Sequence, residues 1–164
     1  MSGEPAFQII PVRSAADVSD TITLFRAYAV WLDLDLTFQG FEAEMAAMPG
    51  KYAATTGGEL LLARDTRTGR AIGCVGLRAL TPTICEMKRL YVTPAGRGSG
   101  LGRALVKRVV EVAKAQGYHE MRLDTLPRMM MAQGLYRKAG FVETDAYYET
   151  PLRETVFLAL NLKD

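Results

Sequence analysis

The sequence has little of several residue types that would indicate particular classes of protein. Its only two cysteines, Cys74 and Cys85, lie in apolar runs without a Cys-x-x-Cys pair, and the single histidine, His119, has no spacing that would complete a zinc site. We therefore predict no metal and no disulfide. Both thiols are expected to be buried and reduced, and His119 is expected to be a surface residue without a catalytic role.

Long hydrophobic runs and a strong excess of one charge are missing as well. No run reaches about 18 apolar residues, and residues 1–11 lack the basic start and sustained apolar core of a signal peptide. A cytoplasmic protein with no membrane contact is expected. The 20 basic and 18 acidic residues leave a net charge of +2, which is too small to predict binding to a polyanion, so nucleic acid is not an expected partner.

The composition that remains is that of a folded globular domain. Of 164 residues, 49% are hydrophobic and 23% are charged, far from the balance that keeps a chain disordered. A chain of this length is large enough to bury a core without disulfides. We predict one domain over residues 1–164.

Hydrophobic periodicity predicts an antiparallel first half. A strand over 7–12 is followed by a helix capped by Ser14 or Asp17, and a second helix over about 41–48 ends at a Pro-Gly pair. Three consecutive apolar runs of strand length follow, at residues 59–64, 71–78 and 84–92, and the first two are joined by turn residues.

The pattern in the second half of the sequence predicts a crossover connection between two parallel strands. The helix that begins at Leu101 ends at Gln116-Gly117, and a short strand follows over 121–125. A strand, helix and strand within about 40 residues make the strands 84–92 and 121–125 parallel neighbours. A further helix over 129–139 and strands beginning at 141 and 155 complete the chain.

Four acids lie on or between the first two helices: Asp33, Asp35, Glu42 and Glu44. They are interpreted either as a solvated helix surface or as an acidic rim that attracts an amine.

A glycine-rich turn joins the strand over 84–92 to the next helix. Gly98, Gly100 and Gly102 let the backbone approach a ligand closely, while the N–H groups of residues 97–103 and the positive end of the helix dipole point to one place. This pattern predicts a pyrophosphate site without lysine or metal; the alternative is a flexible turn.

Two motifs, in this order, resemble those of the GNAT superfamily of acetyl-coenzyme A dependent N-acetyltransferases. The first is Arg97-Gly98-Ser99-Gly100-Leu101-Gly102, and the second is a helix with Ala132, Leu135-Tyr136 and Gly140-Phe141. The resemblance implies the GNAT fold: an α+β protein layered α/β/α, with about four helices and a mixed, mostly antiparallel sheet of six to seven strands that contains a splayed parallel pair.

The resemblance also implies the activity. Acetyl-CoA would be the co-substrate, and a primary amine of a small molecule or a peptide would attack it directly in a ternary complex. The alternative is a non-catalytic acyl-CoA-binding module of the same fold. Dimerisation is common in the superfamily, so a homodimer is an implied assembly. Met129 departs from the pattern, since many members carry asparagine there.

The cofactor-binding residues implied by the resemblance extend over the strand end and the turn. They are Leu90, Tyr91, Val92, Arg97, Gly98, Ser99, Gly100, Leu101, Gly102 and Arg103. The pantetheine arm would run along 90–92, with the N–H of Leu90 polarising the thioester carbonyl. Because a regular ladder has no free N–H to offer, we predict a bulge near 88–90.

Two side chains match catalytic positions of the superfamily. Glu86 matches the general base and would act through a water molecule; its alternative is an ion pair with Lys88 on the same strand face. Tyr136 is the candidate acid for the leaving thiolate, and its alternative is a core tyrosine. The acceptor is expected between about residues 25–48 and the connection that carries Asp145, Tyr147 and Tyr148, whose acids and aromatics favour a cationic or partly apolar amine.

Overall fold

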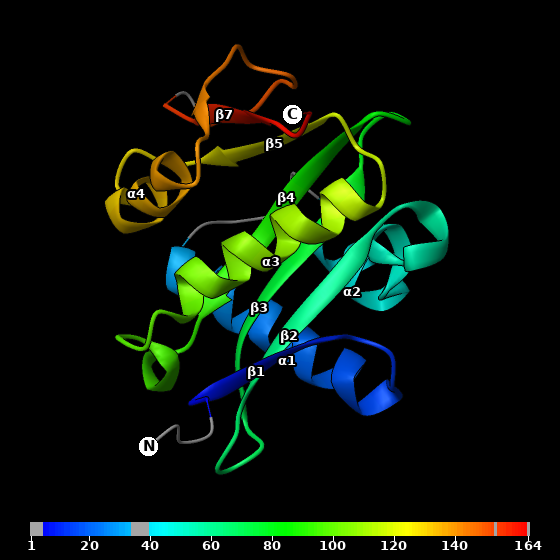
Figure 1. Cartoon of the computed structure of the whole chain (residues 1–164), viewed down its shortest axis with the longest axis vertical. Helices are drawn as coiled ribbons and strands as arrows, with labels where there is room; N and C mark the ends of the chain where they lie inside the picture. Colours follow the sequence, from blue (N-terminus) through cyan, green and yellow to red (C-terminus); the bar gives the residue numbers. More distant parts are fainter. Residues whose placement is uncertain (1–4, 34–39, 153, 164) are drawn as a thin grey trace.

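A seven-stranded sheet with helices on both faces forms the centre of the structure, a computed structural model that describes residues 5–33, 40–152 and 154–163 (Figure 1). The elements in chain order are β1 (Phe7–Pro11), α1 (Ala15–Leu32), α2 (Phe41–Ala47), β2 (Glu59–Asp65), β3 (Ala71–Ala79), β4 (Ile84–Val92), α3 (Leu101–Ala115), β5 (Glu120–Thr125), α4 (Met130–Lys138), β6 (Val142–Glu143) and β7 (Val156–Asn161). The predicted helices and strands are confirmed, with small differences at their ends.

The strand order is β1-β2-β3-β4-β5-β7-β6, and every neighbouring pair is antiparallel except β4 and β5. The parallel pairing extends only from Ile84 opposite Glu120 to Glu86 opposite Arg122. Beyond Glu86 the two strands diverge, as Figure 1 shows. The predicted mixed sheet with a splayed parallel pair is therefore confirmed.

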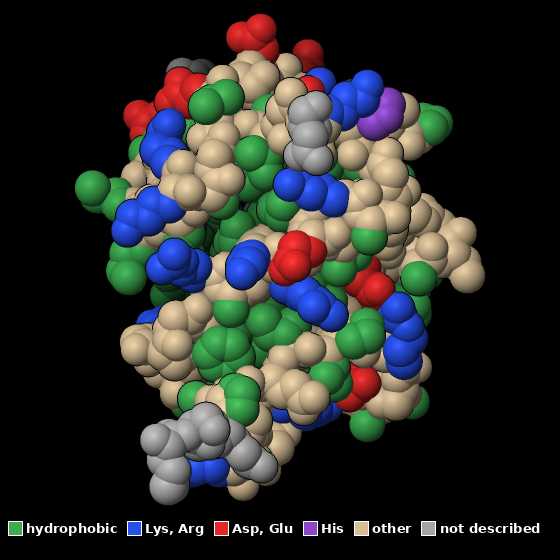
Figure 2. All heavy atoms as spheres, in the orientation of Figure 1, with side chains coloured by type: hydrophobic (Ala, Val, Ile, Leu, Met, Phe, Trp, Pro, Cys, Tyr) green, Lys and Arg blue, Asp and Glu red, His purple; other side chains and the backbone are tan. Residues whose placement is uncertain are grey.

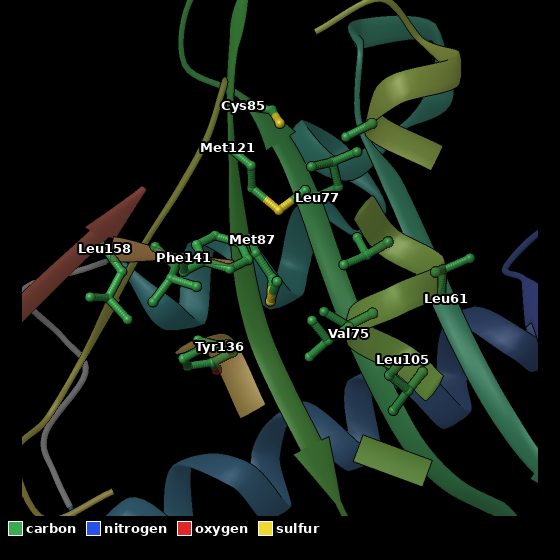
Figure 3. Close-up of a cluster of buried hydrophobic side chains, with 14 of the residues drawn as sticks. Leu61, Val75, Leu77, Cys85, Met87, Leu105, Met121, Tyr136, Phe141 and Leu158 are labelled. Carbon is green, nitrogen blue, oxygen red and sulfur yellow. The ribbon is translucent and has the colours of Figure 1, made fainter. Parts of the chain in front are cut away.

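Each face of the sheet has its own apolar core. The core under α3 and α4 includes Met87, Leu105 and Phe141, all buried (Figure 3). The core under α1 and α2 includes Phe25, Met45 and Tyr52. The fold is consequently the predicted α/β/α layering.

The start of α1 settles one of the alternatives. Ser14 is the N-cap, because its side chain accepts a hydrogen bond from the Asp17 N–H at 3.0 Å. At the other end Asp33 adopts a left-handed conformation with φ of 53° and closes the helix. Asp35 lies outside the described residues.

The cysteines and the histidine lie where the sequence predicts them. Both cysteines are free and buried, and His119 is exposed, as predicted.

None of the described helices is long and apolar enough to cross a membrane. On the face that α3 covers, Lys and Arg side chains are interspersed with Asp and Glu (Figure 2).

A bulge interrupts β4 where the sequence predicts one. Cys74 of β3 pairs with Tyr91, and Gly76 pairs with Lys88, so Arg89 and Leu90 together oppose a single residue. Arg89 has a φ of 61°, in the left-handed region that an arginine rarely adopts. The extra residue changes which side chains face which core.

The change of face is visible in the burial along β4. Before the bulge, Cys85 and Met87 belong to the α3 core, whereas beyond it Leu90 and Val92 pack against that core and Tyr91 belongs to the α1 core. The odd-numbered residues before the bulge and the even-numbered residues after it therefore lie on the same face of β4. The side chains of Glu86 and Lys88, which alternate with Met87, lie toward α1.

A buried ion pair holds the bulge. The Arg89 guanidinium donates to Glu44 of α2 at 3.2 and 3.3 Å, and these two side chains are 3% and 5% exposed. Lys51 and the Tyr52 hydroxyl also contact the Glu44 carboxylate, each at 2.8 Å. Both sequence interpretations are thus wrong for Glu44, which is neither solvated nor part of an open rim. Glu42, by contrast, is exposed and pairs with Arg26.

The contacts of Glu44 change its titration. Burial alone would raise the pKa of this carboxyl, but the hydrogen bonds and charges of Arg89 and Lys51 outweigh it and lower the pKa to about 2. A lowered pKa means that the ionised form stabilises the folded state at neutral pH. That stabilisation is lost as the pH falls from about 5 toward 2.

Glu44→Gln should therefore lower the free energy of unfolding at pH 7 by about 3–5 kcal/mol, because it leaves Arg89 buried without an opposite charge. The matched control Glu42→Gln removes an exposed pair and should cost less than about 1 kcal/mol. Urea unfolding at pH 7 and at pH 3 measures both. The difference between wild type and Glu44→Gln should shrink at the lower pH; equal small losses in both variants would contradict the assignment.

Candidate active site

A pocket opens where β4 and β5 diverge. Because the strands no longer pair there, side chains from both faces of the sheet reach it. Its lining residues are Tyr28, Leu32, Met87, Lys88, Arg89, Leu90, Asp124, Thr125, Leu126, Met129, Tyr136, Tyr148, Leu152 and Thr155. Two segments predicted for the acceptor site contribute to it, through Tyr28 of α1 and Tyr148 of the β6–β7 connection.

The glycine-rich turn ends β4 and begins α3 close to this pocket. Gly100 is the N-cap of α3 with a φ of 80°, and Gly98 has a φ of 82°. A Cβ at either position would meet no atom within 4 Å, so the turn is open on its outer side. The first N–H groups of α3 have no acceptor within the helix. An open turn with free N–H groups at a helix start fits a pyrophosphate.

The other predicted cofactor residues surround this turn. Tyr91 is buried, and the centre of its ring lies 6.0 Å from that of Tyr28 and 6.2 Å from that of Trp31. Only the backbone of Tyr91 is therefore available to a ligand. Leu101 is buried in the α3 core. The Ser99 hydroxyl donates to the Gly96 carbonyl at 2.7 Å, which fixes the turn.

The two predicted arginines differ in how they are held. Arg97 Nε donates to the Val92 carbonyl at 3.2 Å, and its guanidinium lies 5.8 Å from the centre of the Trp31 ring. These contacts hold Arg97 beside the turn. Arg103 is exposed on the first turn of α3.

Leu90 follows Arg89 in the bulge, and neither residue has a partner in the β3 register. The β4–β5 pairing also ends at Glu86, four residues earlier. Leu90 lines the pocket at this point. Leu90 is consequently outside the regular pairing with both neighbouring strands, the place where a polarising N–H group is expected.

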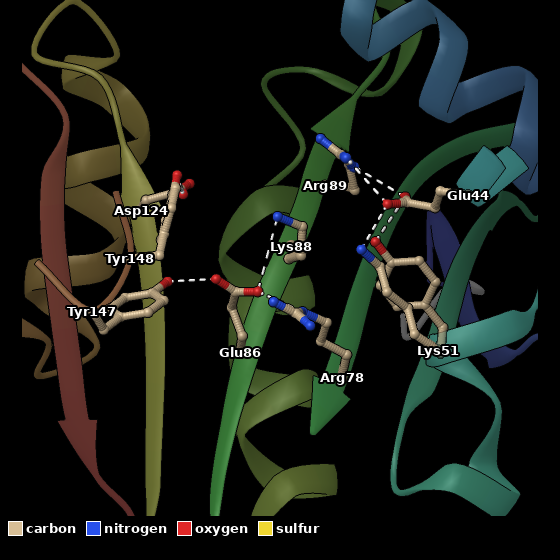
Figure 4. A network of polar contacts seen from close by, with 10 residues as sticks. Glu44, Lys51, Arg78, Glu86, Lys88, Arg89, Asp124, Tyr147 and Tyr148 are labelled. Atoms are coloured by element: carbon tan, nitrogen blue, oxygen red, sulfur yellow. Dashed lines mark hydrogen bonds and ion pairs between the residues drawn. The ribbon is translucent and has the colours of Figure 1, made fainter. Parts of the chain in front are cut away.

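Glu86 lies in a network of polar contacts beside the pocket (Figure 4). Its carboxylate, 2% exposed, accepts from Arg78 Nε at 2.7 Å and from the Tyr147 hydroxyl at 2.5 Å, and Lys88 Nζ is 3.9 Å away. Glu86 is not one of the lining residues. Burial would raise its pKa, but Lys88, Tyr147 and Arg78 together lower it. The ion pair with Lys88 is thus present within a larger network.

Tyr136 lines the pocket from α4 and is 6% exposed. Its ring packs at 5.9 Å from Phe141, and within the described residues its hydroxyl has no hydrogen-bond partner, although the atom is not fully enclosed. Burial raises the pKa of Tyr136, so the phenol stays protonated. The side chain is a core tyrosine by packing, with a hydroxyl that is free to donate.

Three groups in or beside the pocket were not identified from the sequence. Arg89 holds the bulge, Tyr28 forms one wall, and Asp124 accepts a hydrogen bond from the Tyr148 hydroxyl. None of the three left a local signal in the sequence, because their partners are far away in the chain, such as Glu44 for Arg89 and Tyr148 for Asp124.

Met129 lines the pocket, and the Thr125 hydroxyl contacts its sulfur at 3.9 Å. Asp145 lies in a second hollow, along the β6–β7 connection. In the described parts of the chain, no three His, Cys, Asp or Glu side chains are grouped so that they could hold a metal ion.

Comparison with known proteins agrees with this geometry. A family model described as the acetyltransferase (GNAT) family matches residues 26–141. An uncharacterised N-acetyltransferase from Schizosaccharomyces pombe is 39% identical over 155 residues, which is 94% of each chain.

Solved structures share the fold. An acetyltransferase of the GNAT family from Staphylococcus aureus matches with a TM-score of 0.80 and 21% identity, over 96% of this chain and 100% of that one. A phosphinothricin acetyltransferase from Sinorhizobium meliloti, solved in complex with acetyl-CoA, matches with a TM-score of 0.72 and 22% identity. The match covers 95% of this chain and 88% of that one.

Gly100→Ala tests the glycine-rich turn. Gly69, in the β2–β3 turn, is a matched control, because it also has a positive φ and open space around it. Each alanine should lower the free energy of unfolding by about 1 kcal/mol. Only Gly100→Ala should weaken acetyl-CoA binding, by about tenfold in calorimetry, since it moves N–H groups of the first turn. Similar affinities for the two variants would argue against the pyrophosphate site.

Proposed function

The chain belongs to the acetyltransferase (GNAT) family, and on this basis we propose that it moves an acetyl group from acetyl-CoA to a primary amine by direct attack in a ternary complex. The observation that carries the proposal is the continuity of one strand. β4 ends in the open glycine turn, and its bulge at Arg89 and Leu90 lies at the pocket. A pyrophosphate on the turn would leave the arm of the same molecule beside the bulge.

Acetyl-CoA supplies a thioester whose carbonyl carbon an amine attacks. Residues 98–103 would bind the pyrophosphate through their N–H groups, with Arg97 beside them. The N–H of Leu90 would donate to the carbonyl oxygen, which gains negative charge as the carbon–nitrogen bond forms. A donor fixed by the fold needs no reorganisation at that moment, and the buried Glu44–Arg89 pair keeps it in place.

Removal of a proton from the amine is the role that we propose for Glu86, acting through a water molecule. Two observations support this role. The lowered pKa keeps Glu86 ionised, and Glu86 lies two residues before Lys88 on the same face of β4, where Lys88 lines the pocket. Because Glu86 itself does not line the pocket, direct contact with the amine is not part of the proposal.

Tyr136 would donate a hydrogen bond to the sulfur as the carbon–sulfur bond breaks. Its raised pKa makes the phenol a weaker acid than a thiol, whose pKa is about 8.5. The hydrogen bond therefore stabilises the charge on sulfur, and full proton transfer contributes less.

Tyr136→Phe should lower kcat by about 10–100-fold and leave the acetyl-CoA affinity within about twofold, because only the hydroxyl is lost. Tyr118→Phe is a matched control, since the Tyr118 hydroxyl donates to Gly57 away from the pocket. Thiol release over a panel of amines measures kcat, and calorimetry measures affinity. A kcat unchanged by Tyr136→Phe would remove Tyr136 from the reaction, and acetyl-CoA binding without thiol release for any amine would contradict the proposed function.

Glu86→Gln tests the base. Because the pKa of Glu86 is lowered, the wild-type carboxylate is ionised across about pH 6–9, so its loss should lower kcat by about tenfold or more throughout that range. Arg78→Gln removes a partner but keeps the carboxylate, and should lower kcat less than about threefold. Equal losses in the two variants would assign Glu86 to the ion-pair network alone.

A further inference from the structure

Lys88 brings a poorly compensated positive charge to the pocket. Its side chain is 12% exposed, and its Nζ has no hydrogen-bond acceptor among the described residues. The nearest carboxylate oxygen, Glu86 Oε1, is 3.9 Å away and already accepts from Arg78. The ammonium is not fully enclosed by the protein and makes no hydrogen bond to any residue that the structure describes, so its donors are open to a ligand in the pocket.

The neighbouring cation is not available in the same way. Arg89 also lines the pocket, but both of its contacts go to Glu44, which lies in the α1 and α2 layer. Burial lowers the pKa of Lys88, while the charges of Glu86 and Asp124 act to raise it. The lysine is thus the cation of this wall that an anionic ligand can contact.

A carboxylate with one oxygen that accepts no hydrogen bond from the described residues lies on the opposite wall. Asp124 alternates along β5 with Met121 and Leu123 of the α3 core, so it lies on the same face as Lys88. Its Oδ2 accepts from Tyr148, whereas Oδ1 has no donor in the part of the chain that the structure describes. Lys88 and Asp124 are not within 4 Å of each other, and Figure 4 shows the two side chains on opposite sides of the space between β4 and β5.

We infer that the acceptor is an amino acid or a related amine with a carboxylate, held with its carboxylate on Lys88 and its amino group on Asp124. One donor and one acceptor facing each other across a pocket match the two ends of such a zwitterion. The lining also contains apolar side chains that an apolar substituent of the acceptor could contact; they are Leu32, Met87, Leu126, Met129 and Leu152. This inference rests on the proposed function and narrows the cationic or partly apolar amine that the sequence favoured to one that also carries a carboxylate.

The reaction then balances without a further reagent. The amino nitrogen forms a bond to the acetyl carbon, the carbon–sulfur bond breaks, and the electron pair leaves on sulfur. The proton lost by nitrogen matches the one that the coenzyme A thiol gains. The products are an N-acetylated amino acid, whose carboxylate remains on Lys88, and free coenzyme A.

The experiment compares acceptors that differ only in charge. Thiol release is measured for apolar amino acids and for their carboxamides, such as leucine with leucinamide and phenylalanine with phenylalaninamide. Each pair is tested with wild type, Lys88→Met and Lys88→Arg. Lys114→Met is the control, because Lys114 is an exposed lysine in the last turn of α3. Calorimetry with acetyl-CoA confirms that each variant is folded.

Wild type should use the carboxylate member of at least one pair. Lys88→Met should lower the ratio of kcat/KM for carboxylate over carboxamide by about tenfold or more, the value of one charge-assisted contact. Lys88→Arg should restore part of the ratio, and Lys114→Met should leave it unchanged. Should Lys88→Met fail to fold, Asp124→Asn provides a second test, and it should raise KM for both members of a pair.

Other results would overturn the inference. Thiol release with carboxamides or simple amines alone, or a ratio that Lys88→Met does not change, would overturn it and leave the N-acetyltransferase function intact. Acetyl-CoA binding without thiol release for any amine would overturn both.

Discussion

The buried ion pair between Arg89 and Glu44 is the interaction on which the site depends. Arg89 adopts a left-handed backbone conformation that costs about 1–3 kcal/mol, and its charge is out of water. Glu44, with Lys51 and Tyr52 on the same carboxylate, satisfies that charge and fixes α2 against β4. The pair therefore stabilises a distortion that the strand would not keep by itself.

The distortion creates the conditions for chemistry. It removes Arg89 and Leu90 from the β3 register and exchanges the faces of the residues beyond it. Together with the early end of the β4–β5 pairing, it leaves backbone and side chains of one strand open to a pocket reached from both faces of the sheet. The glycine turn at the end of the same strand is then at a fixed distance from the bulge.

Charges around the pocket divide into those that the protein satisfies and those that it leaves for a ligand. Arg89 is paired twice with Glu44, and Glu86 accepts hydrogen bonds from Arg78 and Tyr147, so both maintain structure or act indirectly. Lys88 has only the longer contact to Glu86 at 3.9 Å, and one oxygen of Asp124 has no hydrogen bond within the described residues. Because both residues line the pocket and these atoms are not enclosed by protein, the second set indicates what the pocket binds.

The sequence by itself determined the order of elements, the crossover and the glycine turn. These depend on local periodicity and on backbone freedom at glycine, both of which are readable over a few residues. The bulge near 88–90 is expected from the family resemblance, because the pantetheine arm would need a free N–H there. Only the tertiary structure decided the partners of the charges. Glu44 and Arg89 are 45 residues apart, and Glu86 and Tyr147 are 61 apart. Whether an acid is solvated, paired or open to a ligand depends on burial by distant segments, which no local pattern contains.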